Sequence, residues 1–248
     1  RIKFNNLTIK DSKNKTVVEV EKAIAKLFVL KLYNRDKLNY KKIEMHNGEV
    51  NFNFASMHKY KFLFKNNLGV RPIELINGEI NLLESNQLIS SIQDVNLQYK
   101  FKKNSNNLII KGQFANEPII INLNNFEKKN KKLTNFTIKF LDSKMLTKIK
   151  LSDLDLKKKS ANGEILYKQN KNTLRATFGY TDGNLIIKES NLNNDFLNGN
   201  ITGAASFLPF FSFDLTIDLA GINFSKIHSY LINLNEVEKR NLFKFSKK

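Results

Sequence analysis

The sequence predicts a mainly β protein: an elongated, twisted antiparallel β-meander that forms a groove or an open sandwich, with one or two short helices. Three observations predict it. Apolar and polar residues alternate in many segments, Asn-Gly or Asp-Gly pairs recur between them, and Phe, Tyr and Ile are abundant. Alternation with a period of two is typical of strands with one buried face. With 41% hydrophobic residues among 248, the chain can form a packed interior.

The alternating segments place their apolar residues on one side of each predicted strand. Phe213, Leu215 and Ile217, for example, alternate with Ser212, Asp214 and Thr216. A further run covers 174–180. The residues predicted to line the apolar face are Val50, Phe52, Phe54, Tyr60, Phe62, Phe64, Val95, Leu97, Tyr99, Phe101, Phe136, Ile138, Phe140, Phe211, Phe213, Leu215, Ile217 and Leu219.

Asn-Gly and Asp-Gly pairs predict where these strands turn, because both residues tolerate positive φ in tight hairpins. They occur at 47–48, 77–78, 162–163, 182–183 and 198–199. The first two lie within a repeat, since residues 43–52 match residues 73–82 at six of ten positions. The repeat predicts recurring hairpin units, each of which contacts mainly its neighbours.

Few helices are expected. Residues 224–242 have apolar residues at intervals of three or four, with Ser225 as a candidate N-cap, and a shorter turn is expected near 29–37. No linker divides the chain. We therefore expect one domain over 1–248, belonging to a longer chain, with 1–84 and 85–248 as its candidate sub-modules.

Charge and composition limit the classes of partner. The formal net charge of +18 favours acidic partners such as anionic lipid or nucleic acid, although the scatter of Lys along the chain also fits general Lys enrichment. The absence of cysteine excludes disulfides and thiol chemistry. No apolar run approaches the length of a membrane helix, so any membrane anchor is expected outside this sequence.

The sequence predicts no enzyme, cofactor or metal site. His46, His58 and His228 are far apart in sequence and lack the spacing of metal ligands. Carboxylate pairs such as Asp214 and Asp218 share a predicted wet face, whereas an acid–base pair needs contrasting environments. No phosphate-binding loop or nucleophile motif is present.

The order of segments resembles a known family. Ten segments follow its pattern nearly end to end. They are 4–9, 18–23 and 41–50, then 91–97, 111–114 and 118–121, and finally 185–192, 197–203, 213–219 and 222–227. On these segments the chain resembles the AsmA-like family, which is related to TamB and to repeating β-groove lipid-transfer proteins. The resemblance implies a periplasmic domain, tethered to the inner membrane, that binds phospholipid or another acyl lipid and contributes to outer-membrane lipid homeostasis. It implies no catalytic residue.

Two alternatives remain open. The apolar face could close on itself as a sandwich core, which would leave a structural or protein-binding domain. Lys residues interleaved with aromatic residues could instead bind nucleic acid, but on one strand they point to opposite faces, so no nucleic acid is expected.

Overall fold

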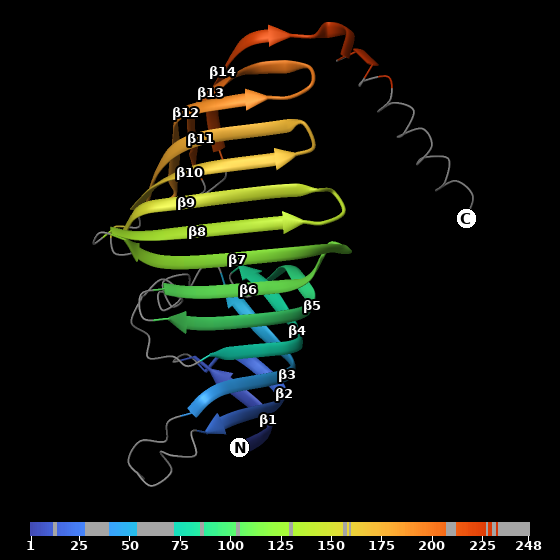
Figure 1. The fold of residues 1–248 in the computed structure, drawn as a ribbon, viewed down its shortest axis with the longest axis vertical. Coiled ribbons are helices and arrows are strands. Elements are labelled where there is room, and N and C mark those ends of the chain that lie inside the picture. The colour runs from blue at the N-terminus through green and yellow to red at the C-terminus, as the bar shows by residue number, and fades with distance from the viewer. Residues whose placement is uncertain are drawn as a thin grey trace, which may run out of the picture.

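The structure is a computed structural model that describes residues 1–11, 14–27, 40–53, 72–84, 87–102, 105–128, 131–155, 158, 160–206, 212–226, 228–229 and 232. It contains one open, twisted sheet of fourteen strands that lie side by side in chain order (Figure 1). The predicted mainly β fold is therefore confirmed. The strands are β1 (Ile2–Lys10), β2 (Thr16–Leu27), β3 (Tyr40–Asn53), β4 (Ile73–Glu84), β5 (Gln87–Lys102), β6 (Ser105–Phe114), β7 (Glu117–Lys128), β8 (Lys131–Phe140), β9 (Met145–Asp155), β10 (Ser160–Gln169), β11 (Asn172–Thr181), β12 (Asn184–Asn193), β13 (Leu197–Ser206) and β14 (Ser212–Ile222).

Strands β3 and β4 are the exception to the antiparallel meander, because they run parallel. Their register aligns residues of 43–53 with those thirty positions later, so the two copies of the repeat lie beside each other. The prediction that the repeat marks hairpin units is wrong. Equivalent side chains of the two strands instead form hydrogen bonds. The side-chain Nδ2 of Asn77 donates to Oδ1 of Asn47 at 2.9 Å, and that of Asn81 donates to Oδ1 of Asn51 at 3.2 Å.

Most of the Asn-Gly pairs lie within strands. The pairs at 47–48, 77–78, 162–163 and 198–199 fall inside β3, β4, β10 and β13, so the prediction that they form hairpin turns is wrong. The pair at 182–183 does form the tight turn between β11 and β12, and both of its residues have positive φ.

Residues with a left-handed backbone conformation inside strands change the side-chain alternation. Positive φ values near 50° occur within four strands, at Asn6 of β1, Asn47 of β3, Asn77 of β4 and Asp94 of β5. In β3, Met45 and Val50 pack against the same core cluster although five positions separate them, because the left-handed backbone at Asn47 reverses the side-chain alternation. The register with β2 is constant across this point, so Asn47 is not an extra residue relative to that strand. The reversal keeps apolar side chains on one face where the sequence switches from odd to even apolar positions.

The best-buried residues lie on this face in the N-terminal half of the sheet. Val20, Leu75 and Val95 are at most 1% exposed, and they belong to a cluster that reaches from β2 to β7. Burial of these aliphatic side chains supplies the main favourable free energy of folding.

The predicted C-terminal helix begins close to its expected start. Residues 224–226 and 228–229 are helical, and residue 232 is as well. Asn223, not Ser225, acts as the cap, because its side-chain oxygen accepts a hydrogen bond from the Lys226 amide at 3.0 Å. The turn expected near 29–37 lies outside the described residues.

Candidate functional site

A continuous line of uncharged, mostly apolar residues crosses all the described strands of the sheet. Each residue of this line pairs laterally with the next, and none carries a charge. We call it the central row; it consists of Phe4, Ala23, Met45, Leu75, Leu97, Ile110, Ile121, Ile138, Thr147, Tyr167, Leu174, Leu192, Gly199 and Leu219.

A second row lies next to the central row and on the same face. It runs from β1 to β12, also without a charged residue, through Ile2, Ala25, Ile43, Ile73, Tyr99, Leu108, Leu123, Phe136, Ile149, Ile165, Ala176 and Ser190. The two rows and the residues flanking them on the same side form what we call the apolar face.

The apolar face contains every predicted residue whose side chain the structure describes. Leu97, Ile138 and Leu219 belong to the central row, and Tyr99 and Phe136 to the second. The flanking residues are Val50, Phe52, Val95, Phe140, Phe213, Leu215 and Ile217. Phe101 lies in β5, but its side chain is not among those described. The predicted residues that lie outside the described part of the chain are Phe54, Tyr60, Phe62, Phe64 and Phe211.

Among the described strands, the residues predicted from sequence come only from β3, β5, β8 and β14, so the contribution of the other strands was missed. The signal is weakest in β10, β12 and β13. Ile165, Leu192 and Ile201 lie on the apolar face, but their strands include Gly, Ala or Ser at apolar-face positions, so the alternation is weak there. In β13 the available signal was the spacing of four between Leu197, Ile201 and Ala205.

Exposure of the apolar face is high at both edge strands and reaches its highest values in β14. Val95 in β5 is fully buried, whereas Ile217 and Phe213 in β14 are 55% and 65% exposed. Large exposed apolar patches on soluble proteins usually mark a binding surface. Strand β14 is therefore the part of the apolar face that is most accessible to a ligand.

Several polar groups lie buried on the apolar face. Beside the second row, Asn106 pairs with Asn125 and Asn125 with Thr134, and all three are at most 6% exposed. Within the second row the buried polar group is that of Tyr99. The Tyr99 side chain is 4% exposed, and its hydroxyl has no hydrogen-bond partner within the described part of the chain. Burial raises the pKa of this phenol above its ordinary value of 10. The hydroxyl therefore stays neutral at physiological pH and can offer one hydrogen bond inside the apolar face.

The opposite face carries the charged groups. Glu44 accepts hydrogen bonds from Lys26 and Lys42, and Lys42 also pairs with Glu74, so four residues on three adjacent strands form one network. The bonds from Lys26 and Lys42 hold the pKa of the Glu44 carboxyl at about 2, below its ordinary value of 4.5. This charged network thus lies on the side of the sheet opposite the central row.

This network gives stability a pH dependence in acid. Because the pKa of Glu44 is lower in the folded state, its contribution is complete above about pH 4.5 and is lost as the pH falls towards 2. We expect acidification through this window to remove about 1 to 3 kcal/mol from the wild-type free energy of unfolding. Urea unfolding at several pH values should show a flatter profile for Glu44→Gln, and parallel profiles would contradict the assignment.

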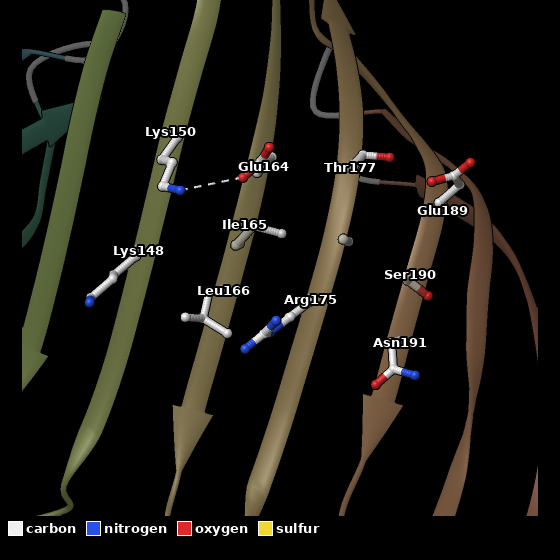
Figure 2. A pocket seen from close by; sticks show the side chains of 11 residues that line it. Lys148, Lys150, Glu164, Ile165, Leu166, Arg175, Thr177, Glu189, Ser190 and Asn191 are labelled. Atoms are coloured by element: carbon white, nitrogen blue, oxygen red, sulfur yellow. Dashed lines mark ion pairs between the residues drawn. The ribbon is translucent and has the colours of Figure 1, made fainter.

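Two shallow hollows lie mainly over the polar side of β7–β12. The first, of about 570 Å³, is lined by Lys148, Lys150, Arg175, Glu164 and Glu189 among others. Figure 2 shows the ion pair between Lys150 and Glu164, whose charged atoms are 3.6 Å apart. The second hollow, of about 600 Å³, shares Lys150 and Glu164 with it. None of the residues predicted from sequence lines either hollow.

The described part of the chain contains neither a metal-binding cluster nor a helix that could span a membrane. No group of three or more His, Asp or Glu side chains there could hold a metal ion. His46 lies in β3 and His228 in the C-terminal helical segment, while His58 is outside the description. None of the helical residues described belongs to a helix long and apolar enough to cross a bilayer.

Comparison with known proteins gives no assignment. No family model matches the chain, and no curated protein or solved structure matches it either.

Proposed function

We propose that the chain is a non-catalytic lipid-binding protein that holds the acyl chains of phospholipid or another acyl lipid against its apolar face. The observation that carries the proposal is the central row, which crosses fourteen strands without a charged side chain. A lipid bound along this row would lie across the strands. Its headgroup would remain in water.

The energetics of apolar contact support binding that is strong but not fixed to one position. Each methylene removed from water contributes about 0.8 kcal/mol, so a chain of about fourteen methylenes gains on the order of 10 kcal/mol before ordering costs. Because aliphatic side chains recur on strand after strand, this gain changes little as the lipid moves along the row. Such a surface suits transfer of lipid better than storage at a single site.

The cellular context that we propose rests on the resemblance of the sequence to the AsmA-like family. It comprises a periplasmic location, a tether to the inner membrane formed by a segment outside this sequence, and a contribution to outer-membrane lipid homeostasis. The formal charge of +18 is compatible with anionic headgroups near the polar side and rims of the sheet.

Substitution of Ile217 tests the proposal with a matched control on the same strand. Ile217 points to the apolar face and pairs with Ile201, whereas the adjacent Thr216 pairs with Thr202 on the polar face. We expect Ile217→Asp to lower the phospholipid bound per chain about tenfold or more, because a carboxylate replaces an apolar contact. Native mass spectrometry of the purified protein measures this ratio.

Thr216→Asp introduces the same charge and should leave bound lipid near the wild-type amount. Both positions lie on β14, whose residues are all exposed, so circular dichroism should show the same strand content in both variants. Equal lipid content in the two variants and the wild type would contradict binding on the apolar face.

A further inference from the structure

Among the described strands, the sheet ends at β1 on one side and at β14 on the other. Strand β1 pairs with β2 and strand β14 pairs with β13, and neither has a second neighbour among the described strands. The two strands lie at opposite ends of the long axis of the molecule (Figure 1). An unpaired edge presents backbone N–H and C=O groups that readily bind another strand.

Both edge strands also expose large apolar side chains on the same side of the sheet. In β1, Phe4 is 46% and Ile9 is 45% exposed, and in β14, Phe213 and Ile217 are more than half exposed. A strand added to either edge would bury these side chains if its own apolar residues continued the apolar face. The occupant must therefore present an amphipathic strand.

The charges of the two edge strands are opposite. The charged residues of β1 are Lys3 and Lys10, whereas those of β14 are Asp214 and Asp218. If β14 paired with β14 of another copy, the strand pair would carry four aspartates. If β1 paired with β1, it would carry four lysines. Like charges across a strand pair destabilise it, whereas opposite charges stabilise it.

The directions of the edge strands allow the mixed pairing. Twelve strand pairs of the sheet are antiparallel and one, β3 with β4, is parallel, so β1 and β14 run in the same direction. A second copy placed head to tail, with its apolar face on the same side, therefore brings its β1 parallel to β14. The parallel pair β3 and β4 shows that this chain accommodates such a ladder.

We propose that copies of this chain associate head to tail, with β14 of one copy pairing in parallel with β1 of the next. The association joins two apolar faces into one surface, which at about 4.8 Å per strand is roughly 130 Å long for two copies. Because the two contacting surfaces differ, the assembly stays open-ended unless its twist closes it into a ring.

Reversal of charge on each edge tests this pairing. Two double variants are compared. One carries Asp214→Lys and Asp218→Lys, so both of its edges are positive. The other carries Lys3→Glu and Lys10→Glu, so both of its edges are negative. We expect the wild type to form oligomers as its concentration rises, and each double variant to need at least about tenfold more protein. An equimolar mixture of the two variants should regain wild-type association, because each edge again meets its opposite charge. Sedimentation velocity at low salt measures all four samples.

Two outcomes would overturn the inference. One is a wild type that stays monomeric at every concentration, as expected if each edge is instead covered by another segment of a longer chain. The other is double variants that associate like the wild type. Native mass spectrometry of the same samples separates this result from the proposed function, because these charge reversals leave the central row intact. A monomer that carries lipid contradicts only the assembly, and a lipid-free oligomer contradicts only lipid binding.

Discussion

Replacing Gly48 with Ala is expected to lower the free energy of unfolding by about 3 kcal/mol, because an added methyl group has no room. A Cβ at this position would lie 2.3 Å from Val20 Cγ1 and 2.6 Å from the Glu19 carbonyl oxygen. Val20 is 1% exposed and pairs directly with Gly48, so neither the side chain nor the backbone of β2 can move away without disturbing the core.

Gly221→Ala is the matched control, since a Cβ added at this strand glycine has no atom within 4 Å. We expect this variant to be unchanged or stabilised by up to about 1 kcal/mol, because Ala has less conformational freedom than Gly in the unfolded chain. Urea unfolding followed by circular dichroism compares the two. Equal losses of stability would show that close approach of the strands is not the reason for glycine at position 48.

The same glycine shows why the strand boundaries were harder to predict than the strands. An Asn-Gly pair supplies a residue that accepts positive φ and a residue without Cβ, and both a hairpin turn and a mid-strand bulge can use them. The pair at 47–48 lies within a strand, with Asn47 at positive φ, and the pair at 182–183 is a turn. A switch of apolar residues from odd positions, such as Met45, to even positions, such as Val50, marks the reversed alternation in the sequence itself.

The sequence predicted the composition of the apolar face better than its exposure. Alternation alone places Leu97, Ile138 and Leu219 on one side, because side-chain direction in a strand depends only on local geometry. Whether such a side chain is buried depends on distant parts of the chain. For this reason Val95 and Ile217, which look equivalent in sequence, are fully buried and 55% exposed respectively.

The parallel pairing of β3 and β4 was also beyond prediction from local pattern. The repeat at 43–52 and 73–82 was visible, but similarity between two strands does not state their direction. Direction follows from the path of the intervening chain. The polar ladder between Asn47 and Asn77 is a consequence of the parallel register and could be recognised only once that register was known.

Photo-crosslinking from β12 is expected to show a large difference in lipid labelling between the two sides of the sheet. Leu192 lies in the central row between Leu174 and Gly199, whereas the adjacent Asn191 pairs with Arg175 on the polar side. A benzophenone amino acid at either position probes groups within a few ångströms of that side chain. Both variants carry the label on the same strand, so local stability and nonspecific binding of lipid affect them equally.

The most direct measurement is therefore the mass of the adducts formed when each benzophenone variant is irradiated in phospholipid-containing membrane extract. The account predicts a phospholipid adduct on the chain labelled at position 192 and none, or only a trace, at position 191. Equal labelling at both positions, or no lipid at position 192, would contradict the claim that the apolar face of this sheet binds lipid.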